Sequence, residues 1–246
     1  MEHCPFGDLE QMLYMRGRLT EIEAKRVTKQ LLDALAYLHS TGIVHCDLKP
    51  QNLLFAEEEA NEPEDLLQQG KPGAGTAEED PVRGKNNKNK SSSSSPAVQV
   101  TSPAGRLAKL CDFGLSCKVP DARFYKHTGD IHKIPWSGLL GTGGYIPPEI
   151  IRQDPFGKSA DLWSVGVMLY QMLSGRMPFM PAKTCLTKRV SFSGPLWTNV
   201  SSEAKDLIRG LLKKVPSERL DADGALQHPW IETIHHLRPS FPHFVP

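Results

Sequence analysis

Apolar residues recur at helical spacing in three parts of the chain. Residues 161–173 are apolar on nearly every side, which predicts a helix in the middle of a hydrophobic core. An amphipathic helix is expected from Leu207 to Leu212, opened by the capping pair Ser201–Ser202. A further helical face ends at the stop signal Gly42. The apolar positions of that face are Val27, Leu31, Ala34, Leu35 and Leu38.

Short apolar runs between these helices predict strands. Ile43–Val44 and Leu53–Phe55 are two such runs, and a third extends from Leu107 to Cys111. The pattern therefore predicts a mainly helical α+β protein with a few short strands around a loop-rich centre.

Residues 56–105 differ from the rest in composition. They contain no Phe, Tyr, Trp, Ile or Met, change from acidic to basic, and include the run Ser91–Ser95. Such a segment buries too little apolar surface to offset its ordering entropy, so we expect a disordered insertion in a surface loop. The serine run is interpreted as a solvated spacer in preference to a phosphorylation target. The chain then divides into a folded part (1–55 and 106–236), this insertion and a C-terminal tail (237–246).

Composition restricts the class of protein. Hydrophobic residues make up 39% of the 246 residues and charged residues 23%, which provides a core and excludes disorder of the whole chain. The net charge of +1 gives no overall attraction to nucleic acid or anionic lipid. No stretch approaches the roughly 18 apolar residues of a membrane helix. We therefore expect neither nucleic acid nor a membrane as a partner.

The five cysteines favour a reducing compartment. They are odd in number and widely spaced, without a CxxC pair, which argues against a disulfide framework and a zinc site. The N-terminal residues do not have the pattern of a signal peptide. The sequence thus predicts a soluble, cytoplasmic protein, with the nucleus left open.

Two stretches carry the groups that phosphoryl transfer needs. Between His45 and Asn52, a carboxylate (Asp47), a cation (Lys49) and an amide follow one another. In Asp112–Gly114 a second carboxylate lies in a turn whose glycine is expected to permit an unusual backbone angle. The reaction needs a carboxylate for the hydroxyl proton, oxygen ligands for Mg²⁺ and a cation beside the moving phosphoryl group.

These stretches resemble the catalytic loop and the D-F-G motif of eukaryotic protein kinases. Other motifs of that family follow in the family's order: Gly141–Ile146, Pro147–Glu149, Asp161–Gly166, Pro216–Leu220 and His228–Trp230. The chain thus resembles the C-terminal lobe of a Ser/Thr kinase, mainly α-helical with short strands around the catalytic loop. The pattern from Pro216 to Trp230 is most similar to the calcium/calmodulin-dependent group. The resemblance also implies that Arg219 pairs with Glu149.

The resemblance implies a role for each matching residue. Asp47 would be the catalytic base or hydroxyl-orienting group, and Lys49 would bind ATP and stabilise the transferring phosphate. Thr142 would hydrogen-bond toward Asp47 and Lys49. Asn52 and Asp112 would hold Mg²⁺ and, with it, ATP.

The substrates follow from the same resemblance. Lys49 comes two residues after Asp47 and is followed by Pro50, as in kinases that transfer the ATP γ-phosphate to Ser or Thr hydroxyls of proteins. Asp8 occupies a place where kinases often have an acidic residue on the ATP ribose. An exposed Asp that caps a helix is an equally good interpretation of Asp8.

The sequence departs from the family most clearly before the catalytic loop. It contains no Gly-rich loop and no strand lysine of the V-A-I-K type, and Met1–Asp8 resembles the stretch after the hinge between the lobes. We therefore expect a chain that begins at the second lobe of a longer kinase. Each lost charged contact with ATP would cost on the order of 2–5 kcal/mol. This favours the alternatives of an inactive kinase-like scaffold or an interaction protein, whereas the intact catalytic groups favour an enzyme.

Cys46 is a second departure. It replaces the arginine that clamps an activation-loop phosphate in phosphorylation-switched kinases, so we expect activity not to depend on phosphorylation of Thr128 or Ser137. A buried, inert thiol is the preferred interpretation of Cys46 over a reactive one.

Overall fold

The computed structural model describes residues 4–57, 105–118, 143–152 and 154–232. Thr142, Thr128, Ser137, the predicted tail and all but the ends of the predicted insertion lie outside the described residues. Within the described part, no helix is both long enough and apolar enough to cross a membrane. The described helices, including short 3₁₀ turns (η), and strands are α1 (Leu9–Arg16), α2 (Glu21–Ser40), β1 (Ile43–Val44), η1 (Pro50–Asn52), β2 (Leu53–Glu57), β3 (Arg106–Leu110), β4 (Cys117–Lys118), η5 (Gly143–Tyr145), α4 (Pro148–Ile151), α5 (Ser159–Ser174), η6 (Ala182–Leu186), η7 (Pro195–Trp197), α6 (Ser202–Leu211), η8 (Pro216–Glu218), α7 (Ala222–Leu226) and α8 (Pro229–Glu232).

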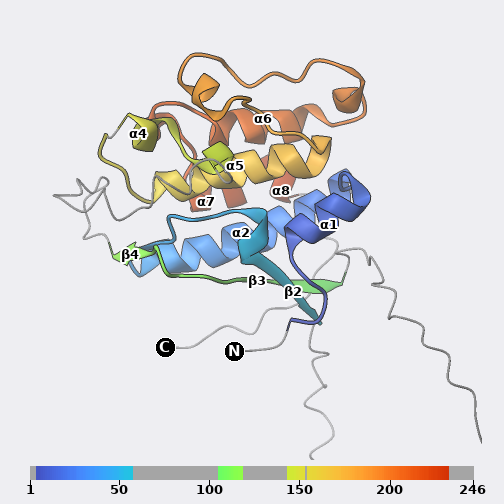
Figure 1. The fold of residues 1–246 in the computed structure, drawn as a ribbon, viewed down its shortest axis with the longest axis horizontal. Coiled ribbons are helices and arrows are strands. Elements are labelled where there is room, and N and C mark those ends of the chain that lie inside the picture. The colour runs from blue at the N-terminus through green and yellow to red at the C-terminus, as the bar shows by residue number, and fades with distance from the viewer. Residues whose placement is uncertain (1–3, 58–104, 119–142, 153, 233–246) are drawn as a thin grey trace, which may run out of the picture. The chain divides into compact units, whose positions relative to one another are not determined.

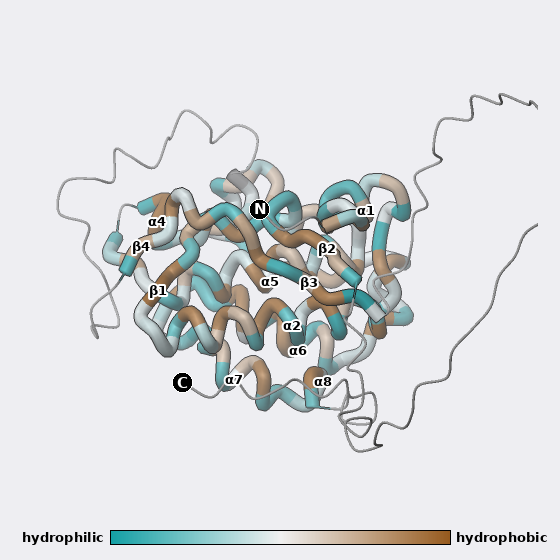
Figure 2. Tube along the Cα trace, turned by 90° about the horizontal axis from the view of Figure 1, so that it is seen from below, coloured by the Kyte–Doolittle hydropathy of each residue, from teal (hydrophilic) through white to brown (hydrophobic). Residues whose placement is uncertain are grey.

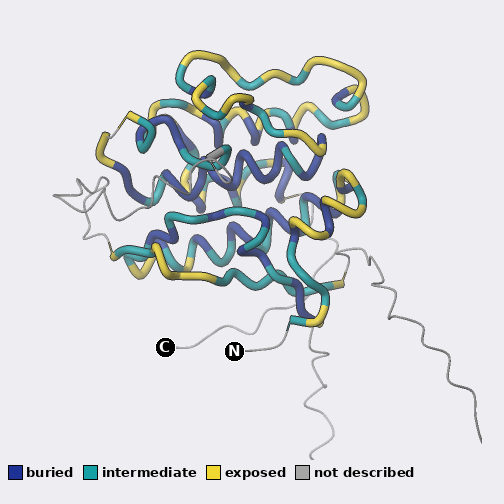
Figure 3. The backbone as a smooth tube through the Cα atoms, in the orientation of Figure 1, coloured by how far each residue is buried: buried dark blue, intermediate teal, exposed yellow. Residues whose placement is uncertain are grey.

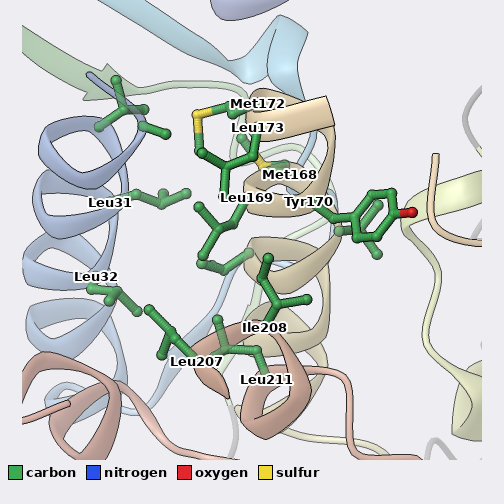
Figure 4. Close-up of a cluster of buried hydrophobic side chains, with 14 of the residues drawn as sticks. Leu31, Leu32, Met168, Leu169, Tyr170, Met172, Leu173, Leu207, Ile208 and Leu211 are labelled. Carbon is green, nitrogen blue, oxygen red and sulfur yellow. The ribbon is translucent and has the colours of Figure 1, made fainter. Parts of the chain in front are cut away.

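Helix α5 forms the centre of the core, as its apolar sequence predicts. It lies between α2 and α6 (Figure 1) and is buried along nearly its whole length (Figure 3). Leucine side chains from α2 and α6 pack against its apolar residues (Figure 4). Burial of an apolar side chain contributes about 1.5–3 kcal/mol, so these contacts dominate the stability of this part of the fold.

The amphipathic helices have the caps that their sequences provide. Thr20 and Glu23 form a capping box at the start of α2, in which each side chain accepts from the other's backbone N–H. Ser201 accepts from the N–H of Ala204 and begins α6, as predicted. Helix α2 ends at Ser40, and Gly42 follows in the left-handed region, with a φ of 79°.

Two small antiparallel sheets lie at the two ends of the loop between β1 and β2. Strand β1 pairs with β4, and β2 pairs with β3 from Leu53–Leu110 to Glu57–Arg106. Figure 2 shows both pairs, with β3 alongside α2. The Gln30 side chain of α2 fixes this contact, since it donates to the Arg106 carbonyl and accepts from the Ala108 N–H.

The ends of the strands differ slightly from the predicted runs. β2 continues through Ala56 and Glu57, two residues beyond the predicted strand and into the range assigned to the insertion. β3 begins at Arg106 and ends at Leu110, one residue earlier than predicted at each end. The cause is ladder pairing, which extends a strand to wherever its partner offers backbone groups.

Candidate active site

The loop between β1 and β2 brings together three of the predicted site residues. The Lys49 Nζ lies 2.6 Å from Asp47 Oδ2, and the Asn52 amide nitrogen lies 3.3 Å from the same oxygen. Asn52 also donates to the Asp47 carbonyl at 2.8 Å. A carboxylate whose side chain is 23% exposed is thus held by a cation and an amide.

Asp161 of α5 fixes the backbone of this loop. Its carboxylate is buried, and it accepts the N–H groups of His45 at 2.9 Å and Cys46 at 3.0 Å. His39 Nε2 lies 2.9 Å from the same carboxylate. These bonds hold Cys46 at a φ of 68°, a left-handed conformation that costs a non-glycine residue about 1–3 kcal/mol.

His45 connects this loop to the second predicted motif. Its Nδ1 accepts the Asp47 N–H at 3.3 Å, so the proton of the neutral ring is on Nε2, which donates to the Cys111 carbonyl at 3.0 Å. The Cys111 N–H in turn donates to the Asn52 carbonyl at 3.0 Å. The residue before Asp112 is therefore bonded to the loop between β1 and β2 through both its carbonyl and its N–H.

Asp112 carries the unusual backbone angle of its motif. Its φ is 62°, whereas Gly114 does not have a positive φ, so the prediction that the glycine supplies this angle is wrong. The physical reason is that the hydrogen bonds of Cys111 fix the chain immediately before Asp112. A bond from the Gly114 N–H to Asp112 Oδ1, 3.3 Å long, closes the turn.

The side-chain oxygen atoms of Asn52 and Asp112 are suitable ligands for Mg²⁺. The Asn52 amide nitrogen donates to Asp47, which leaves its Oδ1 as the oxygen for a ligand, and Asp112 is an exposed carboxylate. Mg²⁺ takes one or two such protein oxygens and completes its shell with water and substrate phosphates. Neither here nor elsewhere in the described part of the chain are three His, Cys, Asp or Glu side chains grouped to hold a metal ion.

Asp8 is the N-cap of α1, where its Oδ1 accepts the Gln11 N–H at 2.7 Å. It also forms an isolated β-bridge with Leu54 of β2. Burial raises the pKa of the Cys111 thiol, and the negative charges of Asp112 and Asp8 raise it further. Asp8 thus caps a helix and also lies close enough to Cys111 for its negative charge to raise the pKa of that thiol.

Glu149 and Arg219 form the ion pair that the resemblance implies. The guanidinium donates to both carboxylate oxygens, at 2.7 and 2.9 Å, and both side chains are buried. Arg219 also donates to the carbonyls of Ser159 and Lys213. This prediction is confirmed.

Sequence reasoning missed the roles of two residues around the site. Nothing in the pattern assigned His45 its bridging position. For Asp161 a signal existed, because a carboxylate in the first turn of an otherwise apolar helix must be satisfied by buried donors.

The protein kinase domain model matches residues 1–68 and 96–231, and the chain belongs to this family. Two of its relatives are calcium/calmodulin-dependent kinases, in agreement with the group that residues 216–230 resemble. The type II subunit delta of Oryctolagus cuniculus is 32% identical over 231 residues, which are 92% of this chain and 33% of that protein. The type II enzyme of Caenorhabditis elegans is 31% identical, over 92% of this chain and 24% of its own length. The chain therefore spans a third or less of each of these relatives.

Proposed function

We propose that this chain carries the phosphoryl-transfer centre of a Ser/Thr protein kinase. The observation that supports this proposal is the Asp47 carboxylate, which contacts Lys49 and Asn52 at once and remains partly exposed. A substrate hydroxyl would donate its proton to Asp47. Lys49 would then move from the carboxylate toward the transferring phosphate, whose negative charge it offsets.

Asn52 and Asp112 would hold Mg²⁺, which when bound neutralises charge on the ATP phosphates. Thr142 would hydrogen-bond toward Asp47 and Lys49, and Asp8 would bind the ATP ribose. Ser and Thr hydroxyls of proteins are the proposed acceptors, because Lys49 and Pro50 follow Asp47 as in Ser/Thr kinases.

Transfer of labelled γ-phosphate to a Ser-containing protein tests the role of Asp47. Asp47→Asn keeps the side chain's size and removes the proton acceptor, so the rate should fall by about 10²–10⁴-fold. Asp223→Asn, on the exposed side of α7, serves as the matched control and should keep the rate of the unmodified chain. A full rate in Asp47→Asn would refute the assignment.

Nucleotide binding tests the metal ligands separately. Calorimetry should show ATP binding that requires Mg²⁺ and weakens in Asp112→Asn, but not in Asp223→Asn. The absence of a Gly-rich loop from the 246 residues favours the second candidate, an inactive kinase-like scaffold. If the chain neither binds Mg·ATP nor transfers phosphate, the scaffold replaces the enzyme.

A further inference from the structure

Two cysteines that are far apart in the sequence meet beside the catalytic loop. Cys46 precedes Asp47, and Cys117 begins β4, a few residues after Asp112. Their sulfur atoms are 3.6 Å apart. The five cysteines are free thiols in the structure, so this is a contact between two thiols.

Backbone pairing accounts for the contact. Val44 of β1 is the register partner of Cys117 in β4, and these two strands lie side by side (Figure 2). Cys46, two residues after Val44, has a φ of 68°, and its N–H donates to the Asp161 carboxylate. Its sulfur is also 3.7 Å from the Val44 carbonyl oxygen. The direction of the Cys46 side chain is therefore fixed by the backbone.

The two thiols differ in reactivity. The contact with Cys46 lowers the pKa of Cys117, whereas this contact and burial raise the pKa of Cys46. Because the thiolate is the nucleophile, Cys117 reacts first. Cys46 lies next to it as the resolving thiol.

We propose that Cys46 and Cys117 form a reversible disulfide that fastens the catalytic loop to the strand following Asp112. The oxidant is a peroxide. The Cys117 thiolate attacks one peroxide oxygen and the O–O bond breaks, which gives a sulfenic acid and, after protonation, water. The Cys46 sulfur then attacks the sulfenic sulfur, loses its proton and releases the second water. Two thiols and one hydrogen peroxide thus give one disulfide and two waters.

Formation of this bond needs only a small movement. A disulfide has a sulfur–sulfur distance of about 2.05 Å, so the two sulfurs must approach by roughly 1.5 Å. The paired strands already hold the two backbones in register. The bond restricts the chain on both sides of the proposed site, since Asp47 follows Cys46 directly and Asp112 precedes Cys117 in the same short segment. A small-molecule thiol reverses it by exchange.

Peroxide treatment of the 246-residue chain tests this proposal without an activity assay. After stoichiometric hydrogen peroxide and alkylation, peptide mass spectrometry should show a Cys46–Cys117 crosslink and the loss of two of the five thiols. Dithiothreitol should restore both thiols. Amide hydrogen exchange over residues 111–118 should slow in the oxidised chain and recover on reduction.

Two variants and one condition provide the controls. Cys117→Ser should abolish the crosslink, and Cys185→Ser, which changes a buried cysteine of η6, should leave it unchanged. The crosslink should form at least about tenfold faster in the folded chain than in urea, because folding brings the thiols together. Over-oxidation of Cys117 without a crosslink, a crosslink between other cysteines in its place, or equal rates in urea would each overturn the proposal.

Discussion

Asp161 shows how much of the site depends on one buried carboxylate. Its two oxygens accept the N–H groups of His45 and Cys46 and contact His39. A buried carboxylate is costly unless it is fully hydrogen-bonded, and the strained angle at Cys46 is costly as well. The strained loop presents the N–H donors that the buried carboxylate needs, and the bonds to the carboxylate in turn hold the strained angle at Cys46.

Asp161→Asn should lower the free energy of unfolding by about 1–3 kcal/mol. The amide keeps one acceptor oxygen and places an NH₂ group against a backbone N–H of the loop. Urea unfolding followed by circular dichroism measures this loss. Asp154→Asn, at an exposed position, is the control and should leave the midpoint unchanged. Equal midpoints for both variants would mean that the buried bonds contribute nothing net.

At the scale of elements, close approach of α5 and α6 determines how the core is filled. A Cβ at Gly166 would lie 2.8 Å from the Cβ of Leu211 and 2.9 Å from Leu212 Cδ2. These distances are shorter than contacts between real carbon atoms. Glycine is therefore required in α5 for packing, although it is a poor helix former.

Gly166→Ala should destabilise the chain by about 1–3 kcal/mol, because the added methyl group forces α5 and α6 apart. Helix propensity alone would give the opposite sign, a gain of about 1 kcal/mol. The thermal midpoint therefore distinguishes the two effects. A higher thermal midpoint for Gly166→Ala would show that α6 can move away from α5 without loss of stability.

At the scale of the whole described fold, buried and partly buried polar contacts join segments that are distant in the sequence. Arg219 near the C-terminal end binds Glu149 of α4, and Glu21 of α2 accepts from Ser201 and from Trp230 of α8. A charge buried with its partner is stable only while that partner stays in place. These contacts therefore couple the helices to one another.

Arg219→Lys should lower the free energy of unfolding by about 1–3 kcal/mol. A lysine cannot donate to both oxygens of Glu149 and also to the carbonyls of Ser159 and Lys213, so buried acceptors lose their donors. Arg209→Lys, on the exposed side of α6, is the matched control and should change stability by less than about 0.5 kcal/mol. Similar losses in both variants would contradict this role for Arg219.

Glu21 should make stability depend on pH in the acid range. Partial burial opposes its ionisation, but hydrogen bonds from Ser201 and Trp230 outweigh this and hold the pKa of Glu21 below its ordinary 4.5. A carboxyl group whose pKa is lower in the folded chain than in the unfolded chain stabilises the fold at pH values above its unfolded pKa. This stabilisation is lost as the pH falls through its folded pKa.

Unfolding of the unmodified chain and of Glu21→Gln, measured from pH 7 to pH 3, tests this dependence. Their difference should be largest above pH 4.5 and shrink below it. Glu218→Gln, at an exposed residue of η8, is the matched control and should change stability by less than about 0.5 kcal/mol at pH 7. A difference that stays constant with pH would show that the effect of Glu21 is not ionic.

Helices and motifs were predictable where a local pattern carries the information. The apolar run of α5 and the Ser201 cap of α6 are of this kind. The pair Glu149–Arg219 joins residues 70 positions apart and was predicted only from the resemblance to protein kinases. The backbone angle at Asp112 was not, because it results from bonds between Cys111 and residues 45 and 52. A local glycine suggested the wrong position for that angle.

The sequence by itself determined the kinase family, the helical character and the side chains available for chemistry, since these depend on residue type and short-range spacing. Only the tertiary structure decided that Asp161 holds the loop between β1 and β2 and that Cys46 faces Cys117. Both contacts join residues more than seventy positions apart. Such contacts form when strands pair and helices pack, and periodicity along the chain carries no record of which distant residues will meet.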